Sequence, residues 1–369
     1  MNKIELSVNV KGNRIWLPRD VQSRITNIFI RVHIERLSFI TKINKDGRLV
    51  IPKEILFGLN IINNSHHNVK IEILQSLDKP ENFLKDGYVD LLFFVSRKTL
   101  SGFDVLVLEE ANNKLRLWYS TKGRPNEIVI NRFVSFKFVR LLGYYQAEGG
   151  KLKLTKRRGR ELNFTNTSLD IIQDFINLSK DLINITEWKA SIRYKENTKE
   201  TEIASLVKIL NDFGVNNVYT HSAKIIDKCS VRLWITSSLI VELVYNCMNS
   251  IRKYLANGEP NQLNLTLASY FLQGVIAGDG NIYCVKGKKH SLHPRLSIFE
   301  SNEECIKDYY KLLMKFGIIG NYVKRKGKNL FIYSGYINKH NLQSVLSNRL
   351  LDCSKNNYER LLKAKLCPV

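Results

Sequence analysis

Two short segments of the chain repeat one residue pattern, and this repetition constrains the fold more than any other feature. Residues 141–149 read LLGYYQAEG and residues 272–280 read LQGVIAGDG. Each segment is an apolar stretch that ends in one acid and a glycine, a pattern that predicts the end of a helix. The acids Glu148 and Asp279 are therefore expected at the ends of two helices.

Small residues recur four positions apart in both segments, so they occupy one face of each predicted helix. They are Gly143, Ala147, Gly274 and Gly278. Two such faces can pack backbone against backbone, which would bring Glu148 and Asp279 to the same end. Two neighbouring carboxylates repel unless a cation lies between them, and Mg²⁺ prefers oxygen ligands. Either segment alone is more typical of core packing with a solvated acid than of a metal site, but the repetition favours a metal site.

These segments resemble the paired motifs of single-chain LAGLIDADG homing endonucleases, whose pattern is L-A-G-L-I-D-A-D-G. The resemblance covers residues 131–369. It implies an α+β fold of two αββαββα repeats, residues 131–255 and 256–369, with saddle-shaped antiparallel sheets and pseudo-two-fold symmetry. It also implies that the eighth-position acids, Glu148 and Asp279, bind Mg²⁺ or Mn²⁺ at the scissile phosphates.

The chain departs from the family pattern at two motif positions. At the sixth position Gln146 and Ala277 replace Asp, and at the second position Leu142 and Gln273 replace Ala. Glu148 is also one methylene longer than Asp, which moves its oxygens by about a bond length.

An alternating, basic segment follows each motif. Residues 151–156 and 161–165 predict one β-hairpin, and residues 282–286 and 295–298 predict another. Their cations would lie along a DNA backbone; the alternative is an ordinary soluble surface. The candidate DNA-binding residues are Lys151, Lys153, Lys156, Arg157, Arg158, Arg160, Lys286, Lys288, Lys289, Arg295, Lys324 and Lys326. Of these, Lys153, Arg158, Lys288 and Arg295 are expected to read bases in the major groove.

The family resemblance further implies basic catalytic residues near the metal. Lys253 and Lys355 follow the last predicted strand of each half and are the candidates, the alternative being two solvated lysines.

Local signals predict the other elements of this region. Ser301 and Glu304 form a capping-box pattern before a helix that Gly317 ends. Further helices are expected at residues 169–182 and 202–213. Strands are expected at residues 231–235, 319–324 and 330–334, and residues 256–262 form a breaker-rich linker.

A second repeat lies at the N-terminus, where residues 11–21 align without gaps on residues 45–55. Each copy has a turn, an arginine, three apolar residues and a proline, which suits a strand followed by a short helix. The repeat resembles the AbrB-like swapped-hairpin fold and implies a DNA-binding module at residues 1–62. Candidate phosphate contacts are Arg14, Arg19, Arg48 and Lys53, although the repeat could serve folding alone.

Residues 63–130 predict a β-rich connector, with strands at 69–74, 91–95, 105–108 and 115–119. No catalytic signature is found in this stretch.

Charge identifies the class of partner. The chain has 57 lysines and arginines against 34 acids, a net charge of +23, which implies a polyanion such as nucleic acid. No apolar run reaches the ~20 residues of a membrane-spanning helix, and the six cysteines show no C-x-x-C spacing. The expected location is cytoplasmic, with nucleoid association when DNA is bound.

Together these features predict a monomeric, metal-dependent endonuclease that hydrolyses specific double-stranded DNA. One alternative is a domesticated, non-cleaving transcriptional regulator, which the N-terminal repeat favours and the retained acids disfavour. Another is an RNA maturase, which would bind structured RNA more tightly than duplex DNA.

Overall fold

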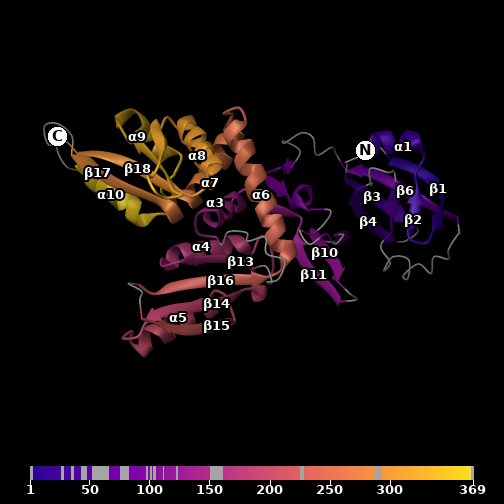
Figure 1. Ribbon diagram of the computed structural model, residues 1–369, viewed down its shortest axis with the longest axis horizontal. Coiled ribbons are helices and arrows are strands. Elements are labelled where there is room, and N and C mark those ends of the chain that lie inside the picture. The colour runs from indigo at the N-terminus through magenta and orange to yellow at the C-terminus, as the bar shows by residue number, and fades with distance from the viewer. Residues whose placement is uncertain are drawn as a thin grey trace. The chain divides into compact units, whose positions relative to one another are not determined.

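The computed structural model describes residues 3–25, 29–34, 37–42, 48–51, 66–74, 83–96, 99, 102, 105–110, 112–121, 124–149, 161–224, 228–286 and 292–366 (Figure 1). The chain divides into two compact units. Unit 1 consists of Met1–Val134 and Ser238–Leu243, and unit 2 of Ser135–Ser237 and Val244–Val369.

Unit 1 is built on a nine-stranded sheet with the strand order β11-β10-β9-β4-β3-β6-β1-β2-β5. Its elements are β1 (Lys3–Lys11), β2 (Arg14–Trp16), α1 (Arg19–Ile25), β3 (Phe29–Ile34), β4 (Leu37–Lys42), β5 (Arg48–Val50), β6 (His66–Leu74), β9 (Leu106–Glu110), β10 (Lys114–Thr121) and β11 (Arg124–Asn131). A smaller sheet has the order β12-β8-β7, from β7 (Leu84–Lys85), β8 (Tyr88–Asp90) and β12 (Phe133–Ser135).

The two copies of the N-terminal repeat interlock. The strands β2 and β5 pair antiparallel, with Ile15 directly opposite Leu49, its equivalent in the other copy. The first strand of each copy pairs with a strand of the other copy, β1 with β6 and β4 with β3. Both copies contribute to one buried cluster that includes Val10, Leu17 and Ile51. This exchange suits a swapped-hairpin module, whose AbrB-like assignment stays a prediction.

The structure of unit 1 adds one observation to the expected organisation and corrects one predicted element. The sheet continues past the expected boundary at residue 62, because β6 pairs with both β1 and β3. Residues 91–95 are not a strand: Leu91–Phe94 form a 3-10 helix. The Asp90 carboxylate accepts a hydrogen bond from the Leu92 N–H at 3.0 Å, and this cap stabilises a helical turn.

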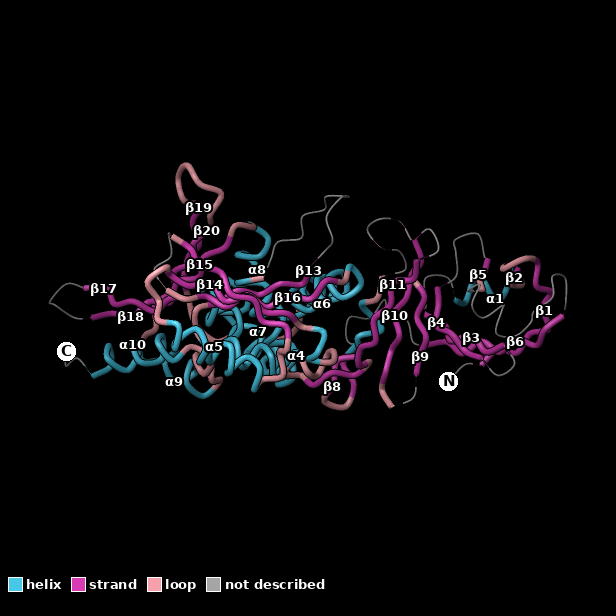
Figure 2. Tube along the Cα trace, turned by 90° about the horizontal axis from the view of Figure 1, so that it is seen from below, coloured by secondary structure: helices cyan, strands magenta, loops and turns pink. Residues whose placement is uncertain are grey.

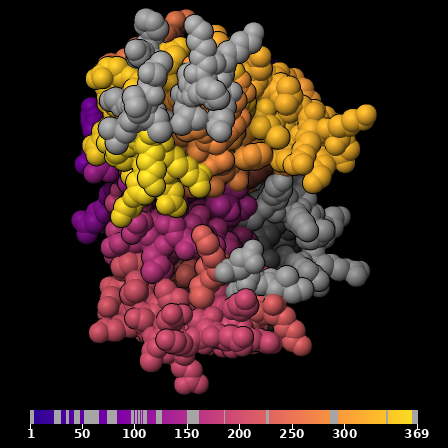
Figure 3. Space-filling view, turned by 90° about the vertical axis from the view of Figure 1, so that its left-hand side faces the viewer, coloured from indigo at the N-terminus to yellow at the C-terminus, as the bar shows by residue number. Residues whose placement is uncertain are grey.

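Unit 2 contains two similar halves (Figure 1). Half 1 comprises α3 (Phe138–Glu148), β13 (Glu161–Asn166), α4 (Leu169–Ser179), η3 (Ile185–Glu187), β14 (Lys189–Lys195), α5 (Glu200–Asp212), β15 (Asn217–Ala223), β16 (Ser230–Thr236) and α6 (Ser238–Asn257) from Val244 onward, since Ser238–Leu243 belong to unit 1. Half 2 comprises α7 (Gln262–Asp279), β17 (Gly280–Lys286), β18 (Leu292–Glu300), α8 (Glu303–Lys315), β19 (Gly320–Lys324), β20 (Phe331–Tyr336), α9 (Lys339–Ser347) and α10 (Lys355–Leu366). Figure 3 shows half 2 in orange and yellow and half 1 in magenta and salmon.

The sheet of half 2 has the order β17-β18-β20-β19 and is antiparallel throughout. The sheet of half 1 has the order β13-β16-β14-β15. Its pairs β13–β16 and β14–β16 are antiparallel, and its edge pair β14–β15 is parallel. The inserted helix α5 supplies the crossover that a parallel pair requires. The expected strand at residues 151–156 lies outside the described residues.

The helix boundaries follow the sequence signals, but the N-cap of α8 differs. The N-cap of α8 is Asn302 and not Ser301: its Oδ1 accepts hydrogen bonds from the N–H groups of Glu304 and Cys305. Its short side chain reaches the free amides of the first turn. At the other end, Gly317 adopts the left-handed conformation, with φ of 73°.

The glycines after the two motif acids do not adopt the left-handed conformation. Gly149 has φ −73° and Gly280 has φ −86°, so the backbone leaves each helix extended. A steric limit accounts for glycine at these positions, because a Cβ atom on Gly149 would lie 2.2 Å from the carbonyl oxygen of Tyr145. Each helix therefore passes directly into the following segment, and Asp279 immediately precedes β17.

Candidate active site at the paired helix ends

The motif helices α3 and α7 are in backbone contact. A Cβ atom on Gly143 would lie 2.2 Å from the carbonyl oxygen of Phe271, and one on Gly274 would lie 2.3 Å from that of Arg140. Both distances are far shorter than any van der Waals contact, so neither position can hold a larger residue in this packing.

The same packing continues to the helix ends. A Cβ atom on Gly278 would lie 2.5 Å from the Ala147 Cβ and 3.0 Å from the Glu148 Cγ. Gly278 directly precedes Asp279, the last residue of α7, and Glu148 is the last residue of α3. The two helices therefore end side by side, each with a half-buried acid as its final residue.

A polar cavity of about 770 Å³ lies beside Glu148 and receives residues from both halves. Half 1 contributes Asn166 and Lys228 to its lining, and half 2 contributes Gly278 and Lys355. The Asn166 Nδ2 donates a hydrogen bond to the Glu148 Oε1 at 3.5 Å. Burial raises the pKa of Glu148, because a charged carboxylate loses hydration there.

The oxygen donors of Glu148 and Asp279 suit a hard divalent cation whose remaining ligands come from water and substrate. Within the described ranges, no cluster of three or more His, Cys, Asp or Glu side chains has the geometry of a metal site. Mg²⁺ commonly binds through one or two carboxylates, with water and substrate phosphates as further ligands. Glu148 and Asp279 provide two such carboxylates at adjacent helix ends, and a cation would offset the cost of burying the Glu148 charge.

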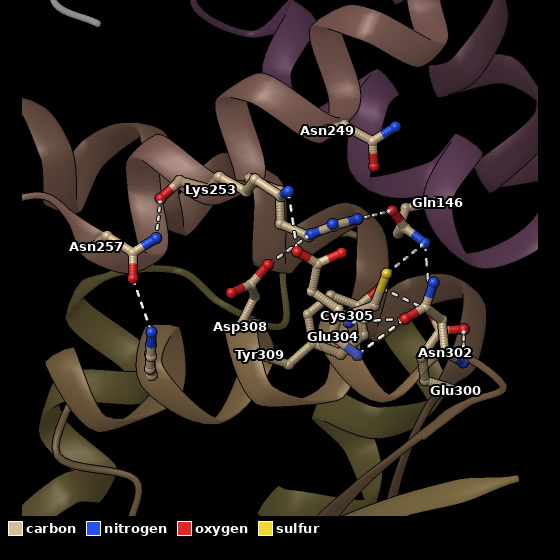
Figure 4. Close-up of polar contacts among 12 residues, drawn as sticks. Gln146, Asn249, Lys253, Asn257, Glu300, Asn302, Glu304, Cys305, Asp308 and Tyr309 are labelled. Atoms are coloured by element: carbon tan, nitrogen blue, oxygen red, sulfur yellow. Dashed lines mark hydrogen bonds and ion pairs between the residues drawn. The ribbon is translucent and has the colours of Figure 1, made fainter.

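The two candidate catalytic lysines differ in position. Lys355 is exposed and lines the cavity beside Glu148. Lys253 lies on α6, where its Nζ pairs with the Glu304 Oε1 of α8 at 2.9 Å (Figure 4). The structure does not bring Lys253 to the lining of that cavity.

The unexpected motif residue Gln146 bridges the two halves. Its Oε1 accepts a hydrogen bond from Arg252 Nη1 at 2.9 Å, and its Nε2 donates to Glu300 Oε2 at 3.3 Å (Figure 4). Arg252 is buried and pairs with Asp308 at 2.8 Å. Glu300 also accepts a hydrogen bond from the Tyr309 hydroxyl, and burial raises the pKa of this tyrosine.

The other unexpected glutamine, Gln273, makes the reciprocal bridge. Its Oε1 accepts a hydrogen bond from Arg140 Nη1 at 3.3 Å, across the helix pair. Arg140 pairs with Asp174 of α4 at 2.6 Å, and the Tyr144 hydroxyl donates to the same carboxylate. Gln146 and Gln273 thus each connect one half to the other.

The exposed face of the half 1 sheet carries cations that the sequence analysis missed. Lys189 and Arg193 alternate along β14, and Arg232 lies on the adjacent strand β16 opposite Ser191. The guanidinium of Arg232 lies 5.5 Å from the ring centroid of Trp234. The alternation of Lys189, Ser191, Arg193 and Lys195 with apolar residues was a detectable strand signal.

Most of the cations expected on the hairpins cannot be placed. Lys151, Lys153, Lys156, Arg157, Arg158, Arg160, Lys288 and Lys289, and the side chain of Lys286, lie outside the described residues. Arg295 lies on β18, Lys324 ends β19, and Lys326 is exposed in the turn that follows.

The candidate phosphate contacts of unit 1 lie near an exposed tryptophan. Arg14 and Arg19 are exposed, and the Arg48 guanidinium lies 4.4 Å from the ring centroid of Trp16, which is 52% exposed. This geometry is a cation–π contact. Lys53 lies outside the described residues.

Comparisons with known proteins find one family match, which lies in half 2, and several solved structures of low similarity. Residues 266–364 match the family model described as a LAGLIDADG-like domain. The structure of mesophilic variants of the homing endonuclease I-DmoI matches with 15% identity and a TM-score of 0.34, over 57% of this chain and 89% of that chain. The structure of I-DmoI in complex with DNA and Mn matches with 14% identity and a TM-score of 0.32, over 57% of this chain and 94% of that chain.

The N-terminal LAGLIDADG domain of DUF199/WhiA also matches, with 16% identity and a TM-score of 0.32, over 62% of this chain and 86% of that chain. No curated protein matches the chain by sequence. Identities and TM-scores this low do not transfer an activity to the chain. In the part of the chain that the structure describes, no helix is long and apolar enough to cross a membrane.

Proposed function

Because residues 266–364 form a LAGLIDADG-like domain, we propose that the chain is a site-specific endonuclease that hydrolyses both strands of duplex DNA. The observation that carries this proposal is the backbone contact between α3 and α7, which ends with Glu148 beside Gly278. A contact this close holds two acids at neighbouring helix ends, as two hydrolytic centres on opposite strands require.

The roles of the residues follow from their positions. Glu148 and Asp279 would hold Mg²⁺ or Mn²⁺, which would supply activation of water and charge stabilisation at the scissile phosphate. Lys355 and Lys228 line the same cavity and attract the phosphodiester backbone. Asn166 orients the longer Glu148 side chain through its hydrogen bond.

The sheets supply the DNA-binding surface. Their strands lie on one side of unit 2, and helices α4, α5, α7, α9 and α10 lie on the other (Figure 2). Lys189, Arg193 and Arg232 on half 1 bind phosphates, and the interlocked module of unit 1 adds Arg14 and Arg48 as a second contact. A net charge of +23 predicts binding that weakens steeply with salt. The protein acts as an intracellular monomer with internal pseudo-symmetry.

Cleavage of a random duplex library tests the proposal. Purified wild-type protein with Mg²⁺ is expected to cut a discrete set of sequences on both strands, whereas Asp279→Asn loses at least 100-fold in rate while it still binds them. The matched control is Asp170→Asn, an exposed acid that lines the same cavity and should leave the rate unchanged. Equal cleavage by wild type and Asp279→Asn would contradict the assignment of the metal site.

A non-cleaving DNA-binding regulator is the second candidate. The interlocked module of unit 1 and the longer acid at position 148 favour it. Specific duplex binding without cleavage in Mg²⁺, Mn²⁺ or Ca²⁺ would support the regulator and exclude the nuclease. Tighter binding to structured RNA than to duplex DNA would instead support an RNA maturase.

A further inference from the structure

The exposed face of the half 2 sheet carries apolar and aromatic side chains on either side of a polar row, which consists of Asn281, Ser297, Ser334 and Asn321. Helices α7, α8 and α10 cover its other face, where Leu296, Ile298 and Tyr333 are buried. The strand registers align two further rows on the exposed face. One row is Tyr283, Arg295 and Tyr336, and the other is Phe299, Ile332 and Val323.

The second row, which we call the apolar row, is open to water. Val323 is 60% exposed and Phe299 is 36% exposed, and Ile332 between them is half-buried. Soluble monomers seldom expose adjoining apolar side chains in this way unless the surface binds something. The occupant must therefore present apolar groups.

Arg295 is stacked on an aromatic side chain of the first row. Its guanidinium lies 3.8 Å from the ring centroid of Tyr336, and its other direct neighbour across the sheet is Tyr283. The Tyr283 hydroxyl is 3.3 Å from the Ser334 Oγ, which fixes that ring over the sheet. A cation stacked in this way loses little further freedom on binding.

Only thymine presents an apolar group, its C5-methyl, in the major groove, and only guanine presents the O6 and N7 pair that an arginine contacts with two hydrogen bonds. We propose that the half 2 sheet reads a thymine-rich half-site through the apolar row and a guanine through Arg295. The inference rests on the proposed duplex binding but not on cleavage.

The sheet geometry sets the size of the half-site. Neighbouring strands lie about 4.8 Å apart, so the apolar row spans about 10 Å, or roughly three base pairs at 3.4 Å each. Arg295 and Phe299 are four residues apart on β18, a separation of about 13 Å. The guanine is therefore expected within about four base pairs of the thymines.

Replacing thymine by deoxyuridine tests the apolar row, because it removes only the methyl group. A bound duplex is first selected from a random library without divalent metal, and each thymine is then replaced singly. Replacing a thymine that contacts half 2 should weaken binding about 3- to 10-fold, which corresponds to the loss of one buried methyl group. Replacing a thymine that contacts half 1 should have little effect.

Protein variants assign the effect to the proposed residues. Val323→Thr keeps the side-chain shape but adds a hydroxyl, and it should remove the preference for thymine over uracil. The matched control, Met314→Gln, alters an exposed apolar side chain on α8 (47% exposed) and should keep that preference. Replacing the guanine by 7-deazaguanine, which lacks N7, should weaken wild-type binding and leave Arg295→Ala unaffected.

The outcomes separate this inference from the proposed function. Duplex binding with equal affinity for thymine and uracil would overturn the inference even if the protein cleaves DNA. Absence of duplex binding would remove both. Self-association in sedimentation that Val323→Thr abolishes would show that a second copy covers the apolar row, and would also overturn it.

Discussion

The two halves of unit 2 share an element order, yet the exposed faces of their sheets are chemically different. Half 1 displays the cations Lys189, Arg193 and Arg232 beside the stacked rings of Tyr219 and Trp234. Half 2 displays the apolar row and, in a separate row, Arg295 stacked on Tyr336. In both halves the buried positions keep the pattern that a two-layer fold requires. The comparison indicates that packing preserved the scaffold while the exposed positions diverged, so the two halves should read different DNA half-sites.

The largest loss of stability is expected at the contact between α3 and α7, where the two halves are equivalent. Gly143→Val and Gly274→Val should each destabilise the protein by more than about 4 kcal/mol, because the added atoms meet backbone that cannot move aside. Urea unfolding measures this loss. As a control, Ala204→Val on the exposed side of α5 should cost less than about 1 kcal/mol. A large difference between the two glycine variants would contradict the symmetric helix packing.

The ion pairs Arg252–Asp308 and Arg140–Asp174, whose arginines bind the two bridging glutamines, should contribute differently to the free energy of unfolding. Arg252→Met leaves the carboxylate of Asp308 buried without its partner and should cost about 3 kcal/mol. Arg140→Met should cost about 1 kcal/mol, because the Arg140–Asp174 pair is more exposed, at 17% and 28%. Thermal unfolding of both variants and of Asp308→Asn tests this order. Equal losses for the two arginines would show that burial does not distinguish the bridges.

The raised pKa of Glu148 predicts a pH-dependent effect. Because burial raises its pKa in the folded state, the folded protein holds this proton more tightly than the unfolded chain, and stability falls as pH rises through the range between the two values. Glu148→Gln should therefore stabilise the metal-free protein at pH 7 and have little effect at pH 3.

Mg²⁺ should reverse the order of stability between the wild type and Glu148→Gln at pH 7. Mg²⁺ is expected to raise the melting temperature of the wild type more than that of Glu148→Gln, because the variant lacks one anionic ligand. The reverse order, or stabilisation by Glu148→Gln that is equal at pH 3 and pH 7, would contradict this account of Glu148.

The smallest effect concerns the surface charge of half 1. Lys189→Gln should weaken binding to all duplexes about equally and reduce the slope of log affinity against log salt by about 1. Val323→Thr in half 2 should leave that slope unchanged while it alters base preference. Fluorescence anisotropy at several salt concentrations measures both. A changed slope in Val323→Thr would mean that the two faces do not divide phosphate binding from base reading.

Local chemistry explains which elements could be predicted. The ends of α3 and α7 follow from apolar runs that stop at an acid and a glycine, and β16 and β20 follow from short runs rich in apolar and aromatic residues. The errors arose where two local signals competed. Ser301 and Asn302 could each cap α8, and the apolar residues at Leu91–Phe94 fit a strand until Asp90 caps them as a helical turn.

The sequence by itself determined the repeated motif, the helix-terminal positions of Glu148 and Asp279, and the excess of positive charge. These features depend on neighbours within a few residues, where periodicity and capping act. Only the tertiary structure decided that Gln146 and Gln273 bridge the halves, that β15 joins its sheet in parallel, and that the two sheets display different surfaces. Each of these depends on partners distant in sequence, because a polar side chain acquires its role from the groups that folding places around it.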